Sequence, residues 1–218
     1  MPRLLFEKTG NAVWISHLDL MRLFQRAFKR AGLPLTHTQG FNPRPSVSIA
    51  MPMSVGLESV CELLDFDLYG EPIPNDQIRD RLNNALVEGV RVLQVYDDGR
   101  KIKHLAYLSC ALTMEYDRPL PENACDSIRS LFAQSEVVVQ KKGKNGTTQQ
   151  NIIPMIRALQ VSGGAGEIRL EALVCCQNPS LNPMQLSAAV AAHLPELTPD
   201  HVRCIRLEIY DTENTIFR

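Results

Sequence analysis

The chain has 218 residues, of which 44% are hydrophobic, and its 23 Lys and Arg side chains nearly balance its 24 Asp and Glu side chains. This length suffices for one domain or for two of about 100 residues each. The near-zero net charge excludes a chain that is basic throughout, although a local basic face is compatible with it. No apolar run approaches the roughly 18 residues of a membrane span, and no signal-peptide pattern follows Met1, so we expect a soluble, cytoplasmic protein with no membrane partner.

The first half of the chain is predicted to have the order βαββαβ. Ser16 is a good N-cap for the first helix, whose apolar residues are spaced for one buried face, and Gly32 ends it. A long loop, 36–45, follows this helix. The predicted strands are 3–8, 46–53, 61–69 and 90–96, and a second helix is predicted over 75–87.

The polar run 97–101 is the best domain boundary, and the same order of elements then repeats. The predicted strands are 105–116, 137–142, 166–176 and 202–210, and the predicted helices are 121–134 and 182–193. We therefore expect an α+β fold of two tandem ferredoxin-like (βαββαβ) units with antiparallel sheets. The first unit is residues 1–98; the second is residues 103–218, with an insert at about 143–164.

The six cysteines do not have the spacing of a metal site. No C-x-x-C motif occurs, so we expect neither a zinc site nor an iron–sulfur cluster, and no other cofactor or metal is indicated. Cys110, Cys175 and Cys204 fall inside apolar strands, which predicts buried thiols in a reducing compartment.

Four basic residues recur on one side of the first predicted helix. Arg22, Arg26, Lys29 and Arg30 stand at i, i+4, i+7 and i+8, opposite its apolar face. No acidic residue follows at i+4 within the helix, so we expect that the row is not neutralised locally. Such a row suits a phosphate backbone or an acidic protein surface. The alternative is a solvated helix face.

The loop after this helix has a composition that a simple connection does not need. Pro43 and Pro45 stiffen the loop. This would hold the aromatic ring of Phe41, the amide of Asn42 and the guanidinium of Arg44 in place to bind a base or a nucleotide. The alternative is a structural crossover fixed by its prolines. Besides the four basic helix residues, the predicted nucleic-acid or ligand contacts are Gln39, Phe41, Asn42, Arg44, Ser46 and Ser48.

His17 and His37 flank the first helix, and a pair of histidines can perform acid–base chemistry such as metal-independent RNA cleavage. They are about 20 residues apart across a helix of roughly 22 Å, which places them near opposite ends unless the loop folds back. Two structural histidines are therefore the competing interpretation, and we assign no catalytic residue.

Four segments of the chain resemble a known family. They are ISHLDL (15–20), RAFKRAGLP (26–34), GFNPRPSVSIAMPMSVGLES (40–59) and ELLDFDL (62–68). These motifs are similar to those of the bacterial "radical-SAM-linked" domain family, and the resemblance extends loosely over the rest of the chain. Its members are encoded beside, or fused to, a larger cobalamin-binding radical SAM protein. Their genes often lie near those of a ribonuclease G-type enzyme and large-subunit ribosomal proteins.

The resemblance implies a cobalamin-binding radical SAM protein as partner and an RNA or ribosomal component as ligand, and it implies no reaction. Asn42 and Arg44 stand where the family has more histidine-like residues, so we expect no metal or proton-transfer role for this loop. The leading hypothesis is a non-catalytic binding module. The alternatives are a metal-independent RNA-processing nuclease of ferredoxin-like fold and a purely protein–protein docking scaffold.

Overall fold

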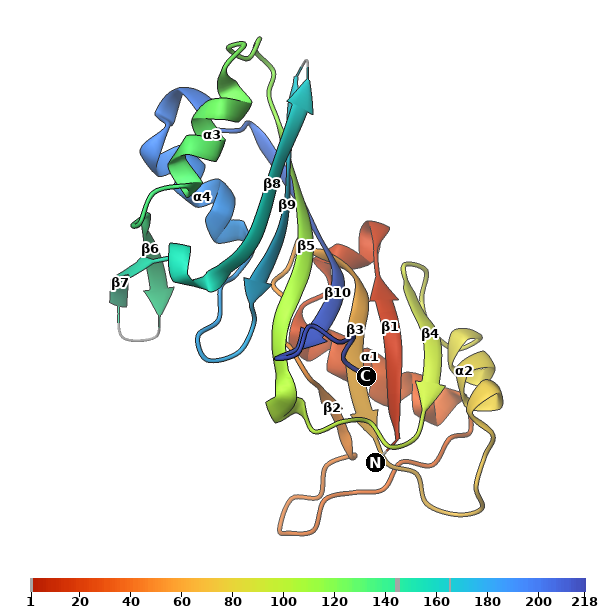
Figure 1. The fold of residues 1–218 in the computed structure, drawn as a ribbon. Helices are drawn as coiled ribbons and strands as arrows, with labels where there is room; N and C mark the ends of the chain where they lie inside the picture. Colours follow the sequence, from red (N-terminus) through yellow and green to blue (C-terminus); the bar gives the residue numbers. More distant parts are fainter. Residues whose placement is uncertain (1, 144–145, 165) are drawn as a thin grey trace. The chain divides into compact units, whose positions relative to one another are not determined.

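The computed structural model describes residues 2–143, 146–164 and 166–218. The chain divides into two compact units, and Figure 1 colours the first from red to yellow-green and the second from green to blue. The N-terminal unit runs to His104 and includes Arg218, and the C-terminal unit is Leu105–Phe217. No helix within the described ranges is long and apolar enough to cross a membrane.

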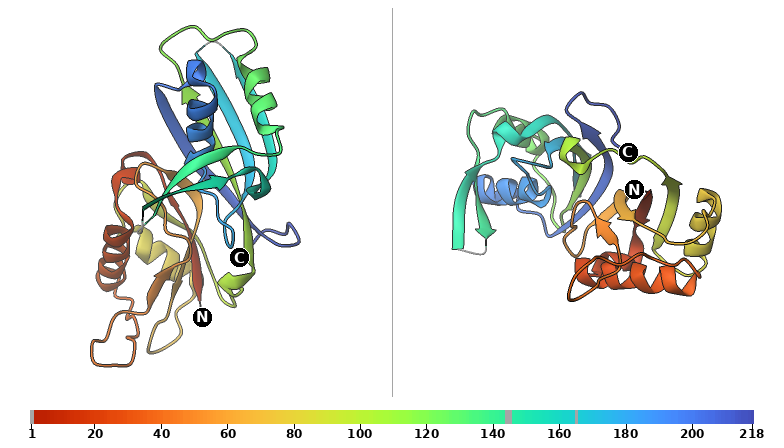
Figure 2. Two further views of the ribbon diagram at one scale, coloured as in Figure 1. Left: turned by 90° about the vertical axis from the view of Figure 1, so that its left-hand side faces the viewer. Right: turned by 90° about the horizontal axis from the view of Figure 1, so that it is seen from below.

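The N-terminal unit is a four-stranded antiparallel sheet with two helices against it. Its strands are β1 (Arg3–Lys8), β2 (Val47–Ile49), β3 (Glu58–Phe66) and β4 (Val90–Tyr96), and its α-helices are α1 (His17–Arg30) and α2 (Asn75–Asn83). The strands pair in the order β4-β1-β3-β2, with every pair antiparallel. Figure 2 shows both helices on the same face of this sheet.

Aromatic packing joins α1 to this sheet. Phe24 packs edge-on against Phe6 of β1, with ring centroids 4.8 Å apart, and Phe28 packs against Phe66 of β3 at 5.1 Å. All four rings are fully buried. The predicted N-cap is confirmed, because the Asp19 N–H donates to Ser16 Oγ at 3.2 Å. Burial of one face of α1 leaves its other face to solvent.

The C-terminal unit has four antiparallel sheet strands of its own and a separate hairpin. Its elements are β5 (Leu105–Glu115), α3 (Ala124–Phe132), β6 (Val138–Gly143), β7 (Gly146–Asn151), β8 (Ile156–Gly164), β9 (Glu167–Cys175), α4 (Met184–His193) and β10 (His201–Asp211). The sheet order is β10-β5-β9-β8. The strands β6 and β7 pair only with each other among the described residues, and a hydrogen bond of 2.9 Å joins the Val138 carbonyl to His193 Nε2 of α4.

The predicted α+β fold with mostly antiparallel strand pairing is confirmed, but the second unit differs from the prediction in its strands. The predicted strand 137–142 corresponds to β6, which lies in the hairpin. Its expected place in the sheet is taken by β8, which falls inside the predicted insert 143–164. The exposed side chains of 147–149 in β7 suit a solvated ribbon, whereas Val161 of β8 is buried. Residues 144–145 of that insert lie outside the described residues.

The N-terminal unit shows two smaller differences. The extended segment 46–53 forms a strand only over Val47–Ile49, and the helix predicted over 75–87 ends at Asn83. Residues 84–89 form a turn before β4 instead. This turn lies beside the end of α1, because Arg30 donates a hydrogen bond to its Ala85 carbonyl.

Candidate nucleic-acid interface

The four basic residues of α1 are all exposed, as their spacing predicted. The expectation that this row is not neutralised locally is wrong at Arg22, whose Nη1 donates to Asp19 Oδ1 at 3.0 Å one turn earlier. The hydrogen bond from the Ser16 hydroxyl, followed by Arg22, lowers the pKa of the Asp19 carboxyl from its usual value. Both members of the pair are well exposed, so it holds the Arg22 side chain only weakly.

The other basic residues of the row differ in their contacts. Arg30 Nη2 donates to the Ala85 carbonyl and so joins the end of α1 to the turn between α2 and β4. This contact uses one donor, and Arg30 has no ion-pair partner in the described ranges. Within the described part of the chain, Arg26 and Lys29 have no hydrogen-bond or ion-pair partner. Their donors are therefore available to an anionic ligand.

A groove of about 470 Å³ lies along the basic side of α1. Its lining residues are Ile15, Asp19, Arg22, Leu23, Arg26, Arg30 and Val87. A second hollow of about 530 Å³ adjoins it beyond Arg30, lined by Arg30, Ala31, Arg81, Asn84, Ala85, Leu86 and Val87. Four arginines thus line one concave surface, which also carries apolar side chains. Lys29 is exposed but does not line either hollow as far as the described residues show.

The far wall of this surface is the 84–89 turn, and hydrogen bonds to the backbone of β4 and of Thr9 set its position. Asn83 Nδ2 donates to the Val92 carbonyl at 2.9 Å, and the Val92 N–H donates to Asn83 Oδ1 at 2.8 Å. The Thr9 N–H donates to the Gly89 carbonyl at 2.8 Å. Gly89 has φ 82°, and a Cβ there would collide with the Thr9 carbonyl oxygen, so only glycine fits.

The predicted loop folds as a hairpin of its own. The Thr38 N–H donates to the Arg44 carbonyl at 2.8 Å, and the Arg44 N–H donates to Thr38 Oγ1 at 3.0 Å. One step further from the tip, the Ser46 N–H donates to the Thr36 carbonyl at 2.8 Å. These contacts leave Phe41 at the tip, with its side chain fully exposed. An aromatic ring displayed on a hydrogen-bonded hairpin is available for stacking.

The structure does not bring the loop residues into the groove. The side chains of Gln39, Phe41, Asn42, Arg44 and Ser48 are exposed, Ser46 is half-buried, and none of them lines either hollow in the described ranges. Figure 2 (left) shows the hairpin, in orange, extending past the end of α1. The helix face and the loop are therefore two separate candidate contacts on one unit.

The two histidines are not brought together either. His17 is the first residue of α1, and its Nδ1 is buried without a hydrogen-bond partner in the described part of the chain. His37 is exposed and pairs with Pro45 in the hairpin at the other end of the helix. Among the described residues, no group of three or more His, Cys, Asp or Glu side chains could hold a metal ion.

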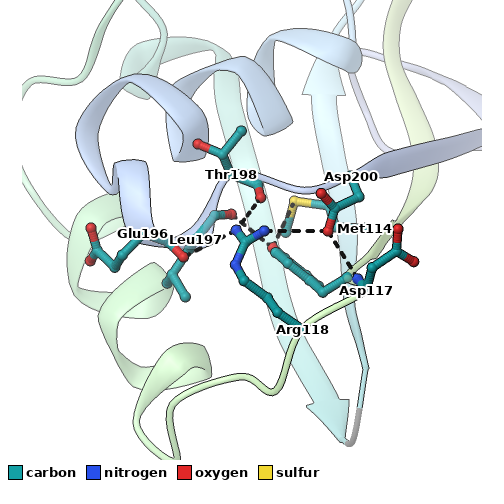
Figure 3. A network of polar contacts seen from close by, with 8 residues as sticks. Met114, Asp117, Arg118, Glu196, Leu197, Thr198 and Asp200 are labelled. Carbon is teal, nitrogen blue, oxygen red and sulfur yellow. Dashed lines mark hydrogen bonds and ion pairs between the residues drawn. The ribbon is translucent and has the colours of Figure 1, made fainter.

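The C-terminal unit has a further cavity, of about 580 Å³, beside the residues that follow β5. Arg118 lines it but already has protein partners. Figure 3 shows its guanidinium directed at Asp200 Oδ2 (3.3 Å) and at the carbonyls of Glu196 (3.3 Å) and Thr198 (2.6 Å). The guanidinium also lies 5.7 Å from the centroid of the Tyr116 ring. These contacts indicate a structural role for Arg118, which joins the end of β5 to the start of β10.

Comparisons with known proteins add a family and a fold. Residues 2–183 match the model of a family described as "Uncharacterized protein conserved in bacteria" (DUF2344). No curated protein matches the chain. A chain in the crystal structure of a Cbf5-Nop10-Gar1 complex is similar in structure, with 9% identity and a TM-score of 0.52 over 95% of this chain and 48% of that one. A chain of an archaeal box H/ACA sRNP Nop10-Cbf5 complex gives 9% identity and a TM-score of 0.47, over 94% of this chain and 46% of that one.

This chain therefore spans about half the length of each of these two solved chains. At 9% identity the first likeness shows a shared fold and nothing about ligands.

Proposed function

We propose that this chain, which belongs to the bacterial family DUF2344, is a non-catalytic module that binds RNA and presents it to a cobalamin-binding radical SAM protein. The observation that carries the proposal is the concave surface beside α1, which four arginines line: Arg22, Arg26, Arg30 and Arg81. The motifs that resemble the radical-SAM-linked family support the partner and the RNA context. We also infer that both units are ferredoxin-like, since each main sheet has the strand order 4-1-3-2 of that plan when the β6–β7 hairpin is set aside.

Charge at this surface favours a polyanion. Asp19 is the one acidic residue that lines either hollow in the described ranges, and it is paired with Arg22. Arg22 and Arg26 are four residues apart, so their backbone positions are about 6 Å apart along the helix axis. Guanidinium groups bind phosphate oxygens through two parallel hydrogen bonds. A row of this kind suits successive phosphates along one strand.

The hairpin would supply a contact that does not depend on charge. Phe41 is fully exposed on a loop that its own hydrogen bonds hold in shape, so a base could stack on it with little loss of entropy. Arg44 and Asn42 stand beside it on the same tip.

An apolar patch on the same unit suits the protein partner. Trp14, at the end of the short 3-10 helix Gly10–Trp14, is 70% exposed, and Leu18 in the first turn of α1 is 67% exposed. The Gly56 N–H donates to the Val13 carbonyl at 2.9 Å, which brings the exposed Val55 close to them. Trp is among the residue types most enriched at the centres of protein interfaces. This observation supports docking of a partner protein, and Trp14→Ser should weaken co-purification with the radical SAM partner without changing RNA affinity.

The nuclease alternative draws no support from the positions of His17 and His37. Its test is incubation of labelled RNA in the presence of EDTA. Cleavage that disappears in a His17→Ala variant would replace the binding-module proposal with the enzyme.

The proposal is tested by the affinity for labelled RNA as a function of salt concentration. Arg22→Ala/Arg26→Ala should weaken binding and reduce the slope of log K against log salt by about one to two units, roughly one for each phosphate that is no longer neutralised. Arg30 is left intact because it also holds the 84–89 turn. The matched control is Arg169→Ala/Arg203→Ala, which removes two exposed, ion-paired arginines from the C-terminal unit.

The control should keep the wild-type affinity and slope. An equal weakening in both double variants would show that the effect is one of overall charge. Wild-type protein that binds no RNA at low salt would end the proposal.

A further inference from the structure

The groove along α1 combines two kinds of surface that a phosphate site alone does not need. Ile15 and Leu23 are half-buried and Val87 is 45% exposed, so each presents apolar surface to the groove. Arg22, Arg26 and Arg30 lie on the same walls. Phosphate contacts use the guanidinium groups, whereas apolar walls favour a group that leaves water on binding.

The apolar side of the groove is held in position before any ligand arrives. Val87 lies on the 84–89 turn, which is fixed at one end by the two hydrogen bonds between Asn83 and Val92. Arg30 binds the turn at Ala85, and Gly89 lies against the Thr9 backbone at its other end. Because these contacts fix the turn, Val87 is kept beside α1 and need not be ordered by the ligand.

The groove volume of about 470 Å³ falls in the range of pockets that enclose a small organic group. In RNA the group with apolar faces is the base, and arginine planes are common stacking partners for it. Bases in an A-form duplex are stacked inside the helix and cannot enter such a groove, whereas bases in loops, bulges and single strands can.

We infer that the groove between α1 and the 84–89 turn holds a base of unpaired RNA, so that the RNA class bound by this module is single-stranded or looped rather than duplex. This inference rests on the proposed RNA binding at the same surface. Arg22 and Arg26 contact the phosphates on either side of the base, and Ile15, Leu23 and Val87 contact its faces.

The test compares the affinities for a short labelled oligoribonucleotide that is unpaired and for the same strand annealed to its complement. The unpaired strand should bind more tightly. Val87→Gln keeps the charge of the site but removes its apolar rim, and Val87→Ala shortens that rim. Both should weaken binding of the unpaired strand by about fivefold, the lower end of a stacking contact, with an unchanged salt slope and unchanged duplex affinity.

The matched control is Leu93→Gln, which changes an exposed apolar residue of β4 that lines neither hollow. It should leave both affinities unchanged. Equal binding of unpaired and paired RNA, with no effect of either Val87 variant, would overturn the inference and leave the proposed function standing. Absence of binding to both RNAs would end the proposed function itself. Tighter binding of polyglutamate than of unpaired RNA at matched charge would also overturn the inference and identify an acidic polypeptide as the occupant.

Discussion

Asn83→Ala should destabilise the N-terminal unit by about 2–4 kcal/mol. Its amide replaces a neighbouring strand at the edge of β4, where it donates to the Val92 carbonyl and accepts from the Val92 N–H. Val92 is only 1% exposed. The Val92 N–H and carbonyl both lose this partner, and each then costs about 1–2 kcal/mol, the lower part of the range for a buried group without a partner.

The assay is urea unfolding of the full chain, together with hydrogen exchange of the peptide that contains Val92. The free energy of unfolding of the variant should fall, and the Val92 amide should exchange faster. The matched control is Asn84→Ala, which changes the next residue, whose side chain makes no hydrogen bond in the described ranges. The reasoning would be refuted if the free energies of unfolding of Asn83→Ala and Asn84→Ala differed by less than roughly 0.5 kcal/mol and the Val92 amide exchanged at the wild-type rate.

Three further predictions concern other buried contacts. Asp65→Asn should lower the free energy of unfolding by about 1.5–3 kcal/mol, because a neutral amide replaces the carboxylate that the almost fully buried Arg3 guanidinium contacts at two points; urea unfolding measures this change, and an unchanged free energy would contradict it. Burial raises the pKa of Tyr116 to about 12, so its contribution to the free energy of unfolding is complete below about pH 10 and disappears as the pH rises from 10 towards 12. Tyr116→Phe should flatten this part of the plot of unfolding free energy against pH, and an unchanged plot would contradict the prediction. Cys125 is half-exposed and should react first with a thiol reagent, whereas Cys204, which is buried and has its pKa raised to about 12, should resist. Mass spectrometry of the labelled protein gives the order of reaction, and rapid labelling of Cys204 would contradict its burial.

Local patterns predicted the basic face of α1 because helical spacing alone decides which residues share a side. They also predicted both ends of the helix, since Ser16 and Gly32 act within one turn of it. The polar loop after α1 was recognised from its prolines and glycines, but its hairpin pairing was not.

The groove itself could not be predicted from the sequence. The turn that forms one wall of the groove begins where α2 ends, at Asn83 rather than at residue 87. The Asn83 side chain is hydrogen-bonded to the backbone of β4 at this point. The end of α2 therefore depends on a contact with Val92, nine residues further along the chain, which local patterns do not reveal. Val87 was missed for the same reason, because its place on the surface follows from the turn. Arg81 lies on α2, within the predicted helix, and was missed because only the tertiary packing of α2 brings it to the hollow.

The error in the second unit has a similar origin. The strand β8 is an edge strand with mostly exposed side chains, so its sequence lacks a clear apolar alternation. The hairpin strand β6 contains the buried Val139 and follows the buried Val137, and it therefore resembled a sheet strand more closely. Which of two candidate strands enters a sheet depends on what packs over them.

The most direct test of RNA binding at the N-terminal unit is ultraviolet cross-linking of the full chain to unpaired RNA, with the cross-linked peptides identified by mass spectrometry. Cross-links should fall on the peptides that contain α1, the 84–89 turn and the Phe41 hairpin, and excess salt should suppress them. Cross-links confined to the C-terminal unit, or none at any salt concentration, would contradict the account.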